Sequence, residues 1–129
     1  AEMLYKEKDI ALFAVGSMVK VAEEVREMLK ERGLHCTLVN ARFVKEFDKE
    51  LIGELSADHT LLVTMEENVA SGGFGEKVLH CLNEHGKDNA FLHFAIPDAY
   101  VEHGNVDLLK KEIGLDAESI ARSIVEKVK

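Results

Sequence analysis

The chain has 129 residues, of which 47% are hydrophobic and 31% charged, so its size and composition fit one domain with a packed core. Its 24 acidic and 16 basic residues give a formal net charge of -8, which argues against nucleic acid or an anionic membrane as a partner. No apolar run approaches the roughly 18 residues of a membrane span and no signal peptide is visible, so we expect a cytoplasmic protein.

The first half of the chain predicts a strand, a helix and a second strand. An apolar run over Ile10–Val15, closed by Gly16, is typical of a strand buried on both faces. Ser17 is a suitable cap for the helix that follows, and Gly33 is placed to end it. The apolar side of this helix is predicted to hold Met18, Val21, Ala22, Val25, Met28 and Leu29, and its polar side Glu23, Glu24, Arg26, Glu27 and Lys30. Cys36–Val39 is the second predicted strand.

The middle of the chain repeats this alternation. Asp48 is the predicted cap of a short helix that carries Leu51, Ile52 and Leu55. Leu61–Met65 is the third predicted strand. After a polar, glycine-rich turn, the next helix is marked by Phe74, Val78, Cys81 and Leu82.

The last third predicts one more strand and two helices. The strand covers Ala90–Ile96 and stops at Pro97. One helix is predicted near Val106–Ile113, and another runs from a cap at Asp116 through Ile120, Ile124 and Val128. Residues Met3–Tyr5 add a short edge strand. Strands that alternate with helices predict right-handed β-α-β units, a mainly parallel sheet and a single three-layer α/β domain over residues 1–129.

The segment Glu66–Gly75 is predicted to join the third strand to its helix. Ligands of open parallel sheets bind beyond the carboxyl ends of the strands, so this segment is the first place to look for a site. Gly72 and Gly73 permit positive φ before a helix N-terminus, which suits an anion or a nucleotide. The dinucleotide and P-loop fingerprints are absent, however, and Glu66 and Glu67 bring negative charge. A structural turn is the favoured interpretation.

The remaining polar residues do not predict a catalytic or metal site. Glu66 and Glu67 are neighbours that point in opposite directions in an extended chain, so a capping or interface role is favoured over acid–base catalysis. Cys81 and His85 have one-turn spacing on a helix, but two ligands fall short of a zinc site. Cys36 and Cys81 lie in apolar stretches and are expected to be reduced, buried thiols.

A series of short motifs resembles, in order and spacing, the C-terminal domain of the 1-deoxy-D-xylulose-5-phosphate synthase family. The motifs are Val39–Lys45 with Asp48, Glu66–Asn68, Gly72–Gly75, Ile96–Asp98, Glu102–Gly104 and Gly114–Asp116. Each is weak alone, but together they cover nearly the whole chain. The resemblance implies a three-layer α/β/α sandwich with a five-stranded, mostly parallel sheet, in which Met3–Tyr5 is the antiparallel edge strand. Glu46 departs from the family, which commonly has proline there.

The resemblance also implies a reaction that this chain does not perform alone. The family condenses pyruvate with glyceraldehyde 3-phosphate, releases carbon dioxide, uses thiamine diphosphate and Mg²⁺, and feeds isoprenoid and thiamine biosynthesis. The family's metal motif and its cofactor-activating glutamate belong to preceding domains, so no catalytic, cofactor-binding or metal-binding residue is carried over to this chain. The isolated domain is expected to be inactive, with the other domains and a second subunit of a homodimer as its partners.

The carboxyl-end rim of the predicted sheet is expected to be an assembly surface or an anion-binding loop. Its candidate residues are Glu67, Asn68, Ser71, Gly72, Gly73, Phe74, Tyr100 and His103. The alternatives are the C-terminal domain of another transketolase-like or 2-oxo acid dehydrogenase enzyme, an independent anion- or nucleotide-binding module, and a separate chain that completes a split enzyme. Because the chain starts at Ala1 without an initiator methionine, we expect a piece of a longer enzyme.

Overall fold

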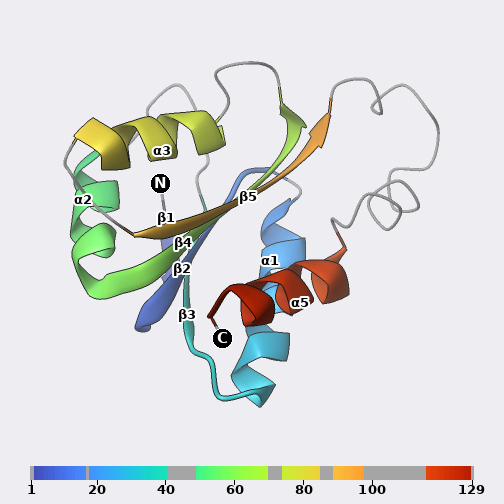
Figure 1. Cartoon of the computed structure of the whole chain (residues 1–129). Helices are drawn as coiled ribbons and strands as arrows, with labels where there is room; N and C mark the ends of the chain where they lie inside the picture. The colour runs from blue at the N-terminus through green and yellow to red at the C-terminus, as the bar shows by residue number, and fades with distance from the viewer. Residues whose placement is uncertain are drawn as a thin grey trace.

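Five strands form one sheet in the part of the chain that the computed structural model describes, which is residues 2–16, 18–40, 49–69, 74–84, 89–97 and 116–128. The elements are β1 (Glu2–Tyr5), β2 (Asp9–Ala14), α1 (Met18–Glu31), β3 (Cys36–Asn40), α2 (Lys49–Asp58), β4 (His59–Val69), α3 (Phe74–Glu84), β5 (Ala90–Pro97) and α5 (Ala117–Val128) (Figure 1). The strand order is β1-β3-β2-β4-β5. The helix predicted near Val106–Ile113 lies outside the described residues.

The strand directions confirm the predicted fold class. β1 is antiparallel to β3, and the pairs β2–β3, β2–β4 and β4–β5 are parallel. In the β1–β3 pair, Glu2 lies opposite Asn40, the last residue of β3. A register shift between Met3 and Tyr5 interrupts this pairing. The sheet is therefore a parallel core with an antiparallel N-terminal edge.

Two apolar clusters explain why helices cover both faces of the sheet. Along β2, Ile10 and Leu12 point to one face while Ala11 and Phe13 point to the other, and all four are buried. Helices α1 and α5 pack on the first face, and α2 and α3 pack on the second (Figure 1). A strand buried on both sides must be apolar throughout, which is what its continuous hydrophobic run predicted.

The predicted helix ends are confirmed where they fall in described residues. Gly33 has a φ of 78° and donates its N–H to the Lys30 carbonyl at 3.0 Å, while Leu34 donates to the Leu29 carbonyl at 2.9 Å. This pair of bonds is a Schellman motif, and its positive φ favours glycine. At the start of α5, a carboxylate oxygen of Asp116 accepts the Ser119 N–H at 3.4 Å. Ser17 and Asp48, the other two predicted caps, lie outside the described residues.

The predicted apolar and polar sides of α1 and α5 need three corrections. Arg26, assigned to the polar side of α1, is only 8% exposed, whereas Met28 is 37% exposed. Both lie about 80° from the centre of the buried stripe, on opposite margins. Arg26 is on the margin that β1 and β3 cover, and Met28 is on the open margin beside α5. Val128, predicted to be apolar core, is 40% exposed near the end of α5.

Candidate functional site

β4 extends beyond the point where the sequence predicted a turn. The apolar run ends at Met65, but Glu66 pairs with Ala95 and Val69 pairs with Pro97 of β5, with a register shift between the two pairs. Pairing with β5 therefore extends the strand through polar residues that have no strand pattern of their own. The prediction that the connecting loop begins at Glu66 is wrong.

This extension changes the setting of the candidate rim residues. Glu67 and Asn68 belong to β4 rather than to a loop, and Phe74 is the first residue of α3. The other candidates, Ser71, Gly72, Gly73, Tyr100 and His103, lie outside the described residues. Their proposed role in a tight turn or an interface stays a prediction.

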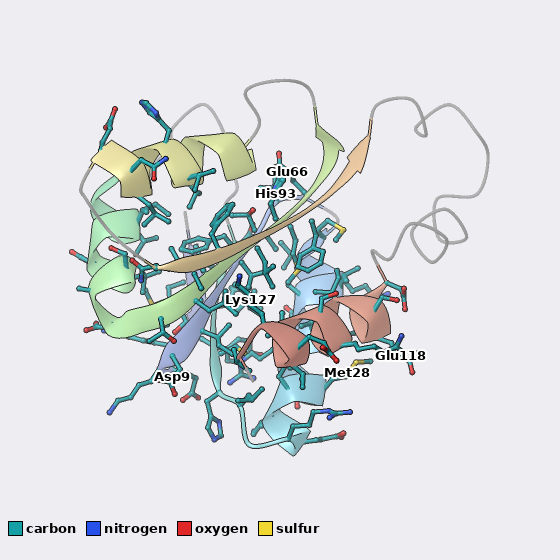
Figure 2. All side chains as sticks on the ribbon, in the orientation of Figure 1. Asp9, Met28, Glu66, His93, Glu118 and Lys127 are labelled. Atoms are coloured by element: carbon teal, nitrogen blue, oxygen red, sulfur yellow. The ribbon has the colours of Figure 1, made fainter. Side chains whose placement is uncertain are left out.

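Three side chains meet at the carboxyl end of the sheet, and we call Thr64, Glu66 and His93 the rim cluster. Thr64 and Glu66 are two residues apart on β4, so they share a face, and His93 of β5 pairs in register with Thr64. The Thr64 Oγ1 lies 2.7 Å from the His93 Nδ1, and a Glu66 carboxylate oxygen lies 3.8 Å from the same nitrogen. Figure 2 shows Glu66 and His93 together at this end of the sheet.

The surroundings of the rim cluster fix its orientation. Thr64 is fully buried and the Glu66 side chain is 6% exposed, whereas the His93 side chain is 29% exposed. The Phe91 ring stacks on the His93 ring with a centroid distance of 6.4 Å and an interplanar angle of 12°. The imidazole thus stands between a buried carboxylate and solvent.

The geometry does not support nucleophilic catalysis at the rim cluster. A Ser-His-Asp relay places its nucleophile and its carboxylate on different nitrogens of one imidazole. Here both groups approach the Nδ1 of His93, and the Thr64 hydroxyl is buried. Among the described side chains, no group of three or more His, Cys, Asp or Glu residues is arranged to hold a metal ion. The cluster is instead suited to holding two strand ends together.

Sequence reasoning found Glu66 but missed His93. Glu66 was singled out for its position after an apolar run, and its predicted interface or capping role is compatible with burial at the rim. His93 sits inside the apolar run of β5, where a histidine has no pattern that distinguishes it. Only the register between β4 and β5 brings it to Glu66, and that register is not readable from either segment alone.

A second polar network lies at the amino end of the sheet, and its bonds are structural. The Nδ1 of His59 lies 2.7 Å from the Leu55 carbonyl oxygen, which can only accept, so this nitrogen carries a hydrogen. The Nε2 lies 2.8 Å from the Thr37 Oγ1, and this oxygen accepts the Glu7 N–H at 2.8 Å. Asn89 donates to the carbonyl oxygens of Ser56 and His59. These buried groups satisfy one another and join α2, β3, β4 and the start of β5.

Cys36 and Cys81 are both buried and form no disulfide, as predicted. Burial raises the pKa of the Cys36 thiol to about 12, an effect that the nearby Arg26 charge opposes and the Glu7 charge reinforces. A thiol in this state is not a nucleophile near neutral pH. None of the described helices combines the length and apolar character needed to cross a membrane.

Comparison with known proteins now places the chain. The family described as the C-terminal domain of transketolase matches residues 1–120. The chain belongs to the transketolase C-terminal domain family. Within it, this transketolase C-terminal domain is 52% identical over 124 residues to the 1-deoxy-D-xylulose-5-phosphate synthase of Lachnoclostridium phytofermentans, covering 95% of the chain and 20% of that relative.

Other relatives and a solved structure agree with this assignment. The domain is 42% identical over 128 residues to the 1-deoxy-D-xylulose-5-phosphate synthase of Caldanaerobacter subterraneus subsp. tengcongensis, covering 99% of the chain and 21% of that relative. The chain thus spans about a fifth of the length of the curated relatives it matches. A solved structure described as a split gene transketolase, inactive beta4 tetramer, superposes with a TM-score of 0.84 at 26% identity, covering 96% of this chain and 40% of that one.

Proposed function

We propose that this chain is the non-catalytic C-terminal domain of a 1-deoxy-D-xylulose-5-phosphate synthase. The observation that carries the proposal is 52% identity over 124 residues to an enzyme of that name, while only 20% of that enzyme is matched. In the proposal, the complete cytoplasmic enzyme condenses pyruvate with glyceraldehyde 3-phosphate for isoprenoid precursor synthesis. Thiamine diphosphate and Mg²⁺ belong to its other domains.

The role that we propose for the domain is assembly with the rest of the enzyme and with a second subunit. In this proposal, the side chains that hold thiamine diphosphate and Mg²⁺ and carry out the reaction lie in the other domains. The Thr64 hydroxyl of the rim cluster is buried, and the cluster links the ends of β4 and β5 at the carboxyl end of the sheet. These features support a surface that positions other domains rather than a substrate.

A second candidate is a separate chain that completes a split transketolase-like enzyme. It is favoured by the similarity to a structure described as a split gene transketolase, although this chain covers 40% of that chain. The complete reading frame separates the two candidates. A continuous frame that encodes the preceding domains supports the first, and a separate upstream gene supports the second.

An activity assay on the full-length enzyme tests the proposal. With thiamine diphosphate and Mg²⁺, the complete chain should form deoxyxylulose 5-phosphate from pyruvate and glyceraldehyde 3-phosphate. The 129-residue domain alone should form no product and should give no calorimetric signal with the cofactor. Sugar exchange without pyruvate condensation in the full-length chain would assign it to another transketolase-like enzyme. Micromolar binding of thiamine diphosphate by the isolated domain would contradict its proposed non-catalytic role.

A further inference from the structure

The turn between β1 and β2 holds a strained backbone conformation. The Ile10 N–H donates to the Lys8 carbonyl at 2.9 Å, which closes a three-residue γ-turn with Asp9 at its centre. Among the described residues other than glycine, only Asp9 has a positive φ, 72°, and a γ-turn with a positive central φ is rare and strained. Asp9 is exposed, at the end of the sheet opposite Glu66 and His93 (Figure 2). The strain therefore comes from the path of the backbone and not from packing of the side chain.

The contacts that hold β1 lie on the far side of this turn in sequence. β1 pairs with β3 from Glu2 to Tyr5, and the guanidinium carbon of Arg26 on α1 lies 3.8 Å from the centroid of the Tyr5 ring. Just before the turn, Glu7 donates its N–H to the Thr37 hydroxyl of β3 at 2.8 Å. β2, which follows the turn, is separated from β1 by β3. Because these contacts are made across the turn, the β1 of another copy can make them unchanged.

β1 is also short and only partly buried. It has four residues, and a register shift between Met3 and Tyr5 interrupts its pairing with β3. Met3 is 37% exposed and Tyr5 is 43% exposed, so release of the strand uncovers little additional apolar surface. β1 should therefore open more easily than the buried strands of the sheet. Its release leaves the β3 edge unpaired, and an unpaired edge is a template for another strand.

We propose that two copies of this chain exchange β1, so that the β1 of each copy pairs with the β3 of the other. In the exchanged dimer, the turn over residues 8–10 opens into an extended connection and Asp9 takes a negative φ. The contacts of β1 are the same in both forms. Relief of strain at two turns therefore offsets part of the cost of bringing two copies together. The inference concerns how copies of this chain associate, and it does not depend on the reaction proposed above.

Two substitutions at Asp9 change the turn in opposite directions without altering the core. Glycine adopts a positive φ at little cost, so Asp9→Gly stabilises the closed turn. A β-branched residue is strongly disfavoured there and suits an extended chain, so Asp9→Val favours the open connection. The chain is refolded from urea at high concentration, and sedimentation velocity then gives the dimer dissociation constant. Because each dimer has two turns, we expect this constant to be about tenfold higher than wild type for Asp9→Gly and about tenfold lower for Asp9→Val.

Gly33→Ala provides a matched control. Gly33 has a φ of 78° at the end of α1, and a Cβ there would have no atom within 4 Å, so alanine adds backbone strain away from the turn. This strain is the same in the single molecule and in the dimer, so the variant should keep the wild-type dissociation constant. The proposal is overturned if Gly33→Ala changes the constant as Asp9→Val does, if the two Asp9 variants change it in the same direction, or if Asp9→Val forms no dimer.

A disulfide across the β1–β3 pair separates strand exchange from contact between intact surfaces. Met3 lies opposite Val39, so Met3→Cys with Val39→Cys places two thiols within bonding reach. After oxidation, the monomer should carry this disulfide within one chain, whereas the dimer of the same protein with Asp9→Val should carry it between two chains. A dimer that keeps only Cys36 and Cys81 should form no covalent link. Disulfides confined to single chains in the isolated dimer would overturn the exchange.

Discussion

Arg26 connects three elements through one buried side chain. Its Nε donates to the Cys36 carbonyl of β3 at 3.2 Å, and its guanidinium carbon lies 3.8 Å from the centroid of the Tyr5 ring at the β1 edge. It also pairs with Glu7 at 3.5 Å. The side chain therefore holds the antiparallel edge strand against α1.

We expect Arg26→Ala to lower the free energy of unfolding by about 2 to 3 kcal/mol, because it removes a hydrogen bond to the Cys36 carbonyl and the contact with Tyr5. Arg26→Lys keeps the charge but loses the planar stacking on Tyr5. Its free energy of unfolding should therefore lie between those of Arg26→Ala and the wild type. Urea denaturation measures both. Arg122→Ala, an exposed change on α5, should stay within about 0.5 kcal/mol of wild type. An equally small effect of Arg26→Ala would show that the side chain does not fasten β1.

Cys36 makes stability depend on pH in the alkaline range. Its pKa is about 12 in the folded chain against an ordinary value of 9.0, so above pH 9.0 the unfolded chain releases the proton while the folded chain keeps it. The stabilisation is complete below pH 9.0 and is lost as the pH rises towards 12. Urea denaturation under reducing conditions should show that the free energy of unfolding falls more steeply with pH over this range for wild type than for Cys36→Ala. The same pH dependence of the free energy of unfolding in both proteins would show that Cys36 does not cause the loss.

At the scale of elements, two glycines of similar surroundings should respond in opposite ways to alanine. A Cβ at either Gly33 or Gly53 would have no atom within 4 Å, so crowding does not separate them. Gly33 ends α1 with a φ of 78°, whereas Gly53 lies inside α2. Gly33→Ala should therefore destabilise by about 1 kcal/mol and Gly53→Ala stabilise by about 0.5 to 1 kcal/mol. Thermal unfolding of the two variants measures this, and shifts of the same sign would refute it.

Elements with a pattern of their own could be predicted from the sequence, and those shaped by a neighbour could not. The apolar runs of β2 and β3 and the stripe of α1 match their structural bounds closely because burial on two faces or one face dictates them. The polar end of β4 has no such pattern, since it is a strand only because β5 lies beside it. Arg26 was misassigned for a related reason: whether the margin of a helix is covered depends on which strand lies next to it.

At the scale of the molecule, alternating strands and helices predicted a parallel sheet covered on both faces, and the resemblance supplied the antiparallel edge. The rim cluster was beyond sequence reasoning, because Thr64 and His93 are 29 residues apart and meet through one register. Histidine occurs six times in the chain, and composition does not distinguish the copy that faces a buried carboxylate. The contacts within such a cluster follow from strand pairing rather than from a sequence motif.

The reversed direction of β1 determines where a longer chain would join this domain. Glu2 lies opposite Asn40, at the end of the sheet where the parallel strands finish, so a domain attached upstream by a short linker would be tethered beside the rim. Docking would then be an intramolecular step, for which short flexible linkers give effective concentrations on the order of millimolar. Contacts too weak to hold two separate molecules together could still hold two domains of one chain together.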